Sequence, residues 1–158
     1  MEERRIIINY NSVCVEELSE EDKRLRNAAV EAAKDAYAPY SHFFVGAAVL
    51  LEDGTIVKGN NQENAAYPSG LCAERVALFS VGASFPDIPV AALAIISMKD
   101  GEIQSSISPC GACRQVILET EQRYGLPVRI LLCGSDETII ISSAKDLLPL
   151  CFGKNNLS

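Results

Sequence analysis

The spacing of apolar residues predicts three long helices and one short helix. Apolar positions recur every three or four residues after Ser19 and stop before Pro39, which indicates a helix with one buried face. Ser19 with Asp22 three residues later resembles a capping box, so the helix is expected to begin there. The other helices are expected from Cys72 to Val81 before Gly82, from Cys110 to Gly125, and from Ala144 to Leu148.

Five runs of apolar and β-branched residues predict strands. Asp53-Gly54 separates the first two runs and is typical of a hairpin turn. After this hairpin, strands alternate with helices, and the run over 90–98 is apolar without alternation, as in a strand covered on both faces. We therefore expect an α/β fold, a three-layer α/β/α sandwich on a mixed five-stranded sheet. The predicted strands are Phe43–Leu51, Thr55–Lys58, Val90–Met98, Val128–Cys133 and Thr138–Ile141.

The first 18 residues carry no clear pattern. Ile6–Ile8 suit either a short strand or an exposed apolar arm. The whole chain has 158 residues, which is enough for one domain and hardly for two. We expect residues 1–18 to be an extension of unknown role and residues 19–158 to form a single domain.

Composition and charge narrow the classes of partner. Hydrophobic residues make up 48% of the chain and charged residues 22%, which is a globular composition and not a disordered one. The net charge of −7, without a basic run, argues against nucleic acid as a partner. No apolar run reaches the 18 or so residues of a membrane span, and Ile6–Ile8 is too short for a signal peptide. We expect a cytoplasmic protein whose six cysteines are thiols or metal ligands.

Three cysteines are placed to bind one metal ion. Cys110 and Cys113 are three residues apart and so share a helix face. Cys72 and Cys110 each stand at a predicted helix start, where unpaired N–H groups favour the thiolate that binds zinc. Three protein ligands would leave a tetrahedral ion with one open position, which is the catalytic arrangement.

Charged residues beside these cysteines complete the candidate site. Glu74 is two residues after Cys72, where a carboxylate in the first helical turn can take a proton from water and pass it on. Three thiolates around Zn²⁺ carry a formal charge of −1, which needs compensation if the ion is to acidify water. Arg75 and Arg114 follow the two cysteine motifs and are candidates to supply it through hydrogen bonds to sulfur.

Interpretations without a catalytic zinc site remain for the same residues. Cys110 and Cys113 also have the spacing of a redox pair, and Cys14, Cys133 or Cys151 would close a structural zinc site as a fourth ligand. Cys133 ends an apolar strand and suits a buried core position. His42 is the single histidine and suits a loop position better than a metal-binding one.

In combination, these motifs resemble the cytidine deaminase family, in its short-chain tetrameric form. Cys-Ala-Glu followed by Pro-Cys-x-x-Cys is the arrangement of zinc deaminases. The resemblance runs from about Arg24 to Phe152 and departs from the family at Gln62, where the loop usually has valine. Five blocks match the family in order: YAPYSHFFVGAAV, GNNQENAAY, LCAER, PCGACRQV and LLPLCF.

The resemblance implies a role for each matching residue. Cys72, Cys110 and Cys113 would hold one Zn²⁺ per chain, and Glu74 would carry the protons. The substrate would be bound by Phe43 against the pyrimidine, Asn61 and Glu63 on the ribose hydroxyls, the Ala73 backbone on the base carbonyl, and Phe152 reaching into a neighbouring subunit. Tyr67 would lie near a subunit boundary, since the resemblance implies a homotetramer with active sites at subunit boundaries.

The function implied is hydrolytic deamination of cytidine and 2′-deoxycytidine to uridine and 2′-deoxyuridine, with release of ammonia, in pyrimidine salvage. One alternative is a deaminase of another small cytosine nucleoside, such as the blasticidin type, although the N-x-E-N loop favours an ordinary nucleoside. The other alternative is a non-catalytic zinc or redox binding protein. The net charge disfavours a deaminase that edits RNA or DNA.

Overall fold

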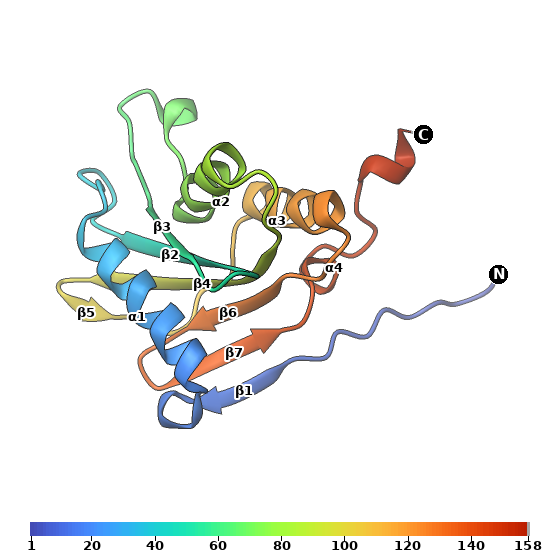
Figure 1. Ribbon diagram of the computed structural model, residues 1–158, viewed down its shortest axis with the longest axis horizontal. Helices are drawn as coiled ribbons and strands as arrows, with labels where there is room; N and C mark the ends of the chain where they lie inside the picture. Colours follow the sequence, from blue (N-terminus) through green and yellow to red (C-terminus); the bar gives the residue numbers. More distant parts are fainter. Residues whose placement is uncertain (158) are drawn as a thin grey trace.

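The computed structural model describes residues 1–157 and contains one mixed sheet between two layers of helix (Figure 1). Helix α1 covers one face of the sheet, and α2, α3 and α4 cover the other. The helices are α1 (Glu20–Lys34), α2 (Ala73–Ser84), α3 (Gly111–Tyr124) and α4 (Ala144–Leu147), with short 3₁₀ turns at Val15–Glu17, Tyr67–Ser69 and Lys154–Asn156. The strands are β1 (Asn11–Cys14), β2 (Phe44–Leu51), β3 (Ile56–Asn60), β4 (Val90–Lys99), β5 (Glu102–Ile103), β6 (Arg129–Cys133) and β7 (Glu137–Ile141).

The predicted mixed α/β fold is confirmed, but the expected count of five strands is wrong, because the sheet has seven strands within residues 1–157. The two additional strands are β1 and β5. Strand β5 has only two residues and pairs with the end of β4, and β1 is mostly exposed along its four residues. Strands this short or this exposed leave no alternation of apolar and polar residues in the sequence.

The strand order places the starts of two helices at one end of the sheet. The order is β1-β7-β6-β4-β2-β3, and β4 pairs in parallel with β6. Both β3 and β4 run antiparallel to β2, so they run parallel to each other. Helix α2 follows β3 and helix α3 follows β4, so both helices begin beyond the carboxyl ends of parallel strands.

Helix boundaries follow the predicted capping residues in most places. The Ser19 hydroxyl accepts the backbone N–H of Asp22 at 3.1 Å, and Gly125 ends α3 with a left-handed φ of 69°. The prediction that Gly82 ends α2 is wrong, because the helix continues to Ser84. A Cβ at Gly82 would lie 3.4 Å from the Arg123 guanidinium, so this glycine lies within the helix and faces α3.

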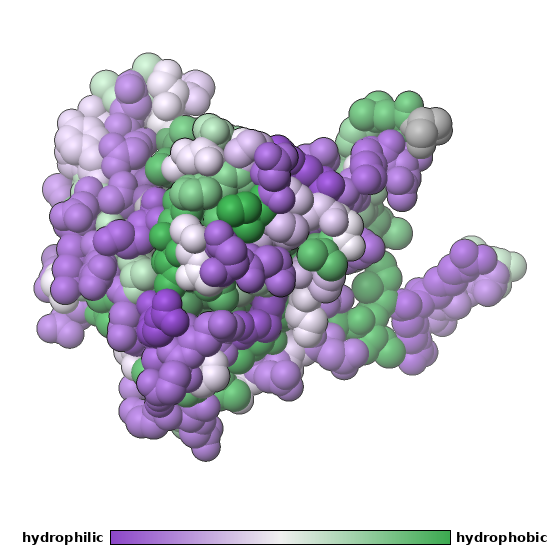
Figure 2. Space-filling model, viewed as in Figure 1, coloured by the Kyte–Doolittle hydropathy of each residue, from purple (hydrophilic) through white to green (hydrophobic). Residues whose placement is uncertain are grey.

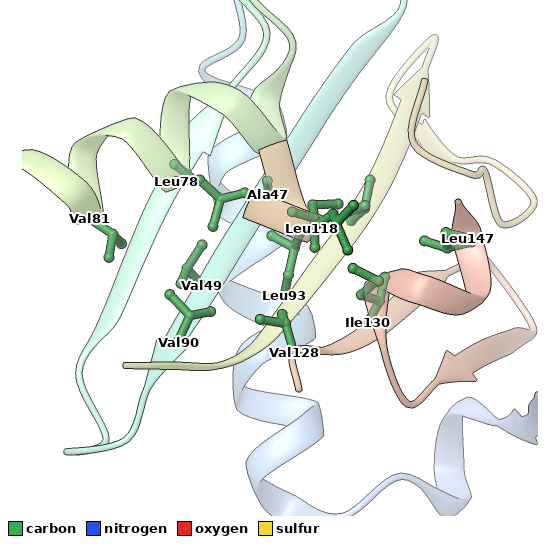
Figure 3. Close-up of a cluster of buried hydrophobic side chains, with 14 of the residues drawn as sticks. Ala47, Val49, Leu78, Val81, Val90, Leu93, Leu118, Val128, Ile130 and Leu147 are labelled. Atoms are coloured by element: carbon green, nitrogen blue, oxygen red, sulfur yellow. The ribbon is translucent and has the colours of Figure 1, made fainter. Parts of the chain in front are cut away.

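The core has two parts, one on each face of the sheet. Figure 3 shows side chains of α2 and α3 meeting those of the central strands, with Leu78 and Leu118 above Leu93. On the opposite face, the apolar side of α1 packs on alanines and on Ile96. Strand β4 is therefore buried on both faces, as its unbroken apolar run predicted.

The residues before the first helix include a strand and an exposed arm. Strand β1 pairs antiparallel with β7, from Asn11 opposite Ile140 to Cys14 opposite Glu137. Residues 1–10 are exposed and extend away from the body (Figure 1). Ile6–Ile8 therefore lie in this arm and not in a strand, which settles the choice left open by the sequence. Within residues 1–157, none of the helices combines the length and the hydrophobicity that a membrane span requires.

Helix α2 lies directly on β3 at Gly59. A Cβ at this position would lie 2.5 Å from the backbone nitrogen of Ala77 and 2.8 Å from the carbonyl oxygen of Ala73. Both atoms belong to the helix backbone and cannot move aside by a rotamer change. We expect Gly59→Ala to lower the free energy of unfolding by roughly 3 kcal/mol, measured by denaturant unfolding.

The matched control for this prediction is Gly82→Ala, in the last turn of α2. There the added methyl group meets only the far end of the Arg123 side chain, and alanine favours the helix. The control should leave the unfolding midpoint unchanged or slightly raised. An unchanged midpoint for Gly59→Ala would show that α2 can shift away from the sheet at little cost.

Candidate metal centre and active site

The three predicted metal ligands come together where α2 and α3 begin. Cys72 and Cys110 are the N-cap residues of the two helices, and Cys113 is in the first turn of α3. The Cys110 sulfur lies 3.8 Å from that of Cys72 and 3.5 Å from that of Cys113. In a tetrahedral site with Zn–S bonds near 2.3 Å, two sulfurs are about 3.8 Å apart. The three thiols thus fit one zinc ion.

The pKa values of two of these thiols are shifted in opposite directions. A hydrogen bond from the Cys113 thiol, aided by the Arg75 guanidinium, lowers the pKa of Cys72 to about 5. The same hydrogen bond, together with burial, raises the pKa of Cys113. One thiolate therefore forms readily within the cluster before any ion binds, and thiolate is the form that binds zinc.

Glu74 lies in the first turn of α2, beside this cluster. Its side chain is only 4% exposed. Burial raises the pKa of the Glu74 carboxyl, and the nearby Cys72 thiolate acts in the same direction. A carboxyl group with a raised pKa is suited to accept a proton and return it near neutral pH.

The two arginines after the cysteine motifs have different partners. Arg75 points a guanidinium nitrogen at the Cys72 sulfur, 3.6 Å away, as the sequence suggested. Arg114 instead donates to the carbonyl oxygens of Pro109 at 2.8 Å and Leu147 at 2.9 Å. The expectation that Arg114 bonds a ligand sulfur is therefore not met. Arg114 holds the segment before α3 against the end of α4.

A cavity of about 510 Å³ opens beside the thiols. Cys72 and Arg75 line its metal side, and Asn61, Glu63 and Tyr67 line the other side. The cavity therefore joins the metal cluster to three residues that the sequence assigned to the substrate or the subunit boundary. A nucleoside-sized molecule fits a pocket of this volume.

Asn61 and Glu63 both bond to the segment that leads into β2. The Asn61 amide accepts the N–H of Val45 at 2.8 Å and donates to the carbonyl of Phe43 at 3.0 Å. The Glu63 carboxylate accepts the N–H of Tyr40 at 2.9 Å and the hydroxyl of Ser41. Each side chain still has hydrogen-bonding capacity for a ligand.

The other residues that the sequence assigned to the substrate are not among the described residues that line this cavity. Phe43 is half-buried just before β2, Ala73 is buried as the first residue of α2, and Phe152 is 59% exposed near the C-terminus. Gln62, the departure from the family pattern, is exposed and donates to the Asn60 side chain at 2.6 Å. Its backbone pairs with Leu71 across the loop.

Several residues of the cavity wall were not assigned to the site from the sequence, among them two in the loop after α1. Tyr40 and Ser41 line it from the loop after α1, and the Tyr40 ring meets that of Tyr67 edge-on, with centroids 6.2 Å apart. The available signal was the polar stretch between Pro39 and the first strand. Nothing in that stretch showed that it faces a loop more than 20 residues later in the chain.

The other cysteines lie apart from the cluster. Among the described residues, only the three thiols of Cys72, Cys110 and Cys113 group closely enough to share an ion. Cys133 is buried against α1 on the opposite face of the sheet, where burial raises its pKa to about 11. The described residues therefore form no closed site with a fourth cysteine, and a tetrahedral ion held by the three thiols would keep one ligand position for solvent.

Comparison with known proteins identifies the family. The profile described as "Cytidine and deoxycytidylate deaminase zinc-binding region" matches residues 19–124. The chain belongs to this deaminase family. The cytidine deaminase of Sporosarcina psychrophila is 42% identical to it over 144 residues, which cover 91% of this chain and 95% of that protein.

Other deaminases extend the likeness to the fold. A cytidine deaminase of Mycobacterium tuberculosis is 42% identical over 139 residues, covering 84% of this chain and 90% of that protein. The crystal structure of cytidine deaminase from Burkholderia pseudomallei aligns with a TM-score of 0.71 at 41% identity. That alignment covers 85% of this chain and all of the Burkholderia chain. This deaminase therefore shares both the sequence and the architecture of solved cytidine deaminases.

Proposed function

We propose that this deaminase catalyses the zinc-dependent hydrolysis of cytidine and 2′-deoxycytidine to uridine and 2′-deoxyuridine, releasing ammonia, in pyrimidine salvage. The observation that carries the proposal is the grouping of three thiols with the buried carboxyl of Glu74, next to a cavity that Cys72 lines. The likeness to cytidine deaminases over most of the chain supports the choice of substrate.

The metal cluster supplies the activation of water. Cys72, Cys110 and Cys113 would hold one Zn²⁺, a Lewis acid that lowers the pKa of water in its open position. Arg75 offsets the negative charge of the thiolates through its contact with the Cys72 sulfur. In this way the arginine keeps a site with three thiolates from becoming too electron-rich to acidify water.

Glu74 moves the protons in this proposal. Its carboxylate accepts a proton from the attacking water and gives it to ring N3 of the cytosine, which makes C4 more electrophilic. The carboxylate then takes the second proton of the water from the hydroxyl group now on C4 and transfers it to the amine, which leaves as ammonia while C4 becomes a carbonyl. The burial that raises the pKa of Glu74 supports this role, because the group must gain and lose a proton in each turnover.

The cavity wall would hold the nucleoside. We assign the ribose hydroxyls to Asn61 and Glu63, which line the cavity with unused hydrogen-bonding capacity. The pyrimidine would pack against Phe43, and its carbonyl would meet the backbone of Ala73. Ala73 is in the first turn of α2, which borders the cavity through Arg75, and Phe43 comes two residues after Ser41 of the cavity wall.

Subunit contacts are part of the same proposal. Figure 2 shows an apolar area over α2, and Phe79 on that helix is 51% exposed. Tyr67 and Phe152 are also largely exposed. Exposed apolar surface of this kind is commonly covered by other subunits. We propose a homotetramer in which Phe152 reaches a neighbouring active site near Tyr67.

Two further assignments stay predictions. The single deaminase domain over residues 19–158, with residues 1–18 as an extension, follows from the sequence pattern. A cytoplasmic location follows from the thiol content, and the six cysteines are free in the structure.

The test of the proposed function is a panel of cytosine nucleosides with zinc quantified in the same preparation. We expect about one zinc per chain and release of ammonia from cytidine and 2′-deoxycytidine, followed by ultraviolet absorbance. Activity on blasticidin S without activity on cytidine would support the nearest alternative enzyme. Bound zinc without any ammonia would support the non-catalytic alternative.

A further inference from the structure

The Glu63 carboxylate is held by three donors from two consecutive residues. One of its oxygens accepts the backbone N–H of Tyr40 at 2.9 Å and that of Ser41 at 3.3 Å. The other oxygen accepts the Ser41 hydroxyl at 2.5 Å. A carboxylate bound through both oxygens is fixed in position and in the orientation of its plane.

The Ser41 hydroxyl is itself oriented by the backbone. Its oxygen accepts the N–H of Phe43 at 3.1 Å, so its hydrogen is left to point towards Glu63. The hydrogen bonds thus run in one direction, from Phe43 to Ser41 and from Ser41 to Glu63, and the second of them uses the single hydroxyl proton of Ser41. Ser41 is exposed and lines the cavity together with Glu63, so its hydroxyl performs this bonding at the surface where a ligand would lie.

Backbone hydrogen bonds fix the main chain of Glu63 but not its carboxylate group. The Glu63 N–H donates to the Tyr37 carbonyl at 2.9 Å, and the Tyr37 N–H donates to the Asn61 carbonyl at 3.0 Å. These bonds hold the two loops side by side. The glutamate side chain has three further rotatable bonds, and only Tyr40 and Ser41 restrain its end in the described structure.

The same contacts keep the carboxylate charged. The Ser41 hydrogen bond is the main cause that lowers the pKa of Glu63. An ionised carboxylate is a stronger acceptor for hydroxyl groups than a neutral carboxyl group. A fixed, ionised acceptor is what recognition of a sugar hydroxyl requires.

We propose that Ser41 is a positioning residue for ribose recognition, whose hydroxyl holds the Glu63 carboxylate in the orientation that accepts the sugar hydroxyls. This inference rests on the proposed function, since it assumes that Glu63 contacts the ribose. It assigns to Ser41 no contact with the reacting atoms. Its effect therefore falls on nucleoside binding and depends on the presence of the sugar hydroxyls.

The test compares Ser41→Val with Ser41→Thr, which have nearly the same shape but differ in the hydroxyl group. On cytidine, we expect the valine variant to have a kcat/KM roughly tenfold below that of the threonine variant, the effect of one hydrogen bond to a charged group. The difference should appear in KM, with kcat equal within about twofold. The threonine variant should remain close to the unmodified enzyme.

The decisive comparison uses 2′,3′-dideoxycytidine, which lacks the 2′- and 3′-hydroxyls of the ribose and keeps the 5′-hydroxyl. It is measured as a substrate and as a competitive inhibitor of cytidine turnover, so that slow turnover does not prevent a result. We expect the two variants to differ by less than about twofold on this analogue. Equal losses on both nucleosides would mean that Ser41 only supports the loop, and equal activity of both variants on cytidine would also overturn the proposal.

Ser12→Ala is the matched control. The Ser12 hydroxyl also donates to a glutamate, Glu137, across β1 and β7 at the opposite edge of the sheet from β3. This control should leave both nucleosides unaffected. If the unmodified protein releases no ammonia from cytidine, the proposed function fails, whereas a failure of the Ser41 comparison with an active enzyme rejects the inference about Ser41 alone.

Discussion

The Glu74→Gln variant should bind zinc as well as the unmodified protein and yet deaminate cytidine slower by roughly three orders of magnitude or more. Glutamine has nearly the same size and fills the same buried place in the first turn of α2. It cannot accept a proton from water or deliver one to the base. The expected loss is therefore in kcat, measured from initial rates at saturating cytidine, with one zinc per chain retained.

The control for this prediction is Glu119→Gln, an exposed glutamate on α3. It makes the same chemical change on the surface and should leave kcat within about twofold. A Glu74→Gln enzyme with an ordinary rate would remove this residue from proton transfer. A variant that has lost its zinc would instead show that Glu74 maintains the metal site.

The zinc content of the Cys72→Ala variant should fall from about one ion per chain to nearly none, and the variant should lose its activity. Two thiols remaining at the start of α3 leave the ion without the ligand that α2 supplies. Because Cys72 is also the thiol with the pKa lowered to about 5, the cluster loses its most readily formed thiolate. Zinc is measured by metal analysis after dialysis against a weak chelator.

Cys151→Ala is the matched control, since Cys151 is also a half-buried free thiol. It should keep its zinc and its activity, because Cys151 lies outside the cluster of ligands. Retention of zinc by Cys72→Ala would mean that another group completes the site. Loss of zinc from Cys151→Ala would mean that the ligand set includes a fourth cysteine.

The sequence predicted the metal cluster well because the determining signals are local. Cys72 and Cys110 each precede a helix with a glycine near its end, and Cys113 follows Cys110 by one turn. Two helix starts after parallel strands must lie at the same end of a sheet. The convergence of these three thiols thus follows from a pattern that can be read without coordinates.

The sequence could not predict features that depend on pairs of distant residues. Ser41 and Glu63 are 22 residues apart, and no periodicity links a loop serine to a loop glutamate. Arg114 looked like a partner for sulfur because it follows Cys113, but the carbonyls of Pro109 and Leu147 bind it instead. Unpaired carbonyls near helix ends compete for guanidinium groups, and only the tertiary structure shows which contact is made.

The boundaries of the catalytic apparatus differ from those of the unit that folds. The segment over 19–124 contains every group assigned to chemistry, but β4 pairs in parallel with β6, which begins at Arg129. A chain that ended at residue 124 would lack β6, so one backbone edge of β4 would be unpaired. Ile130 and Leu132 would also be missing from the hydrophobic core that packs on β4. Such an edge pairs readily with other chains. The last fifth of this protein supplies no proposed metal ligand, but it covers that edge, and we expect this cover to protect the catalytic part from aggregation.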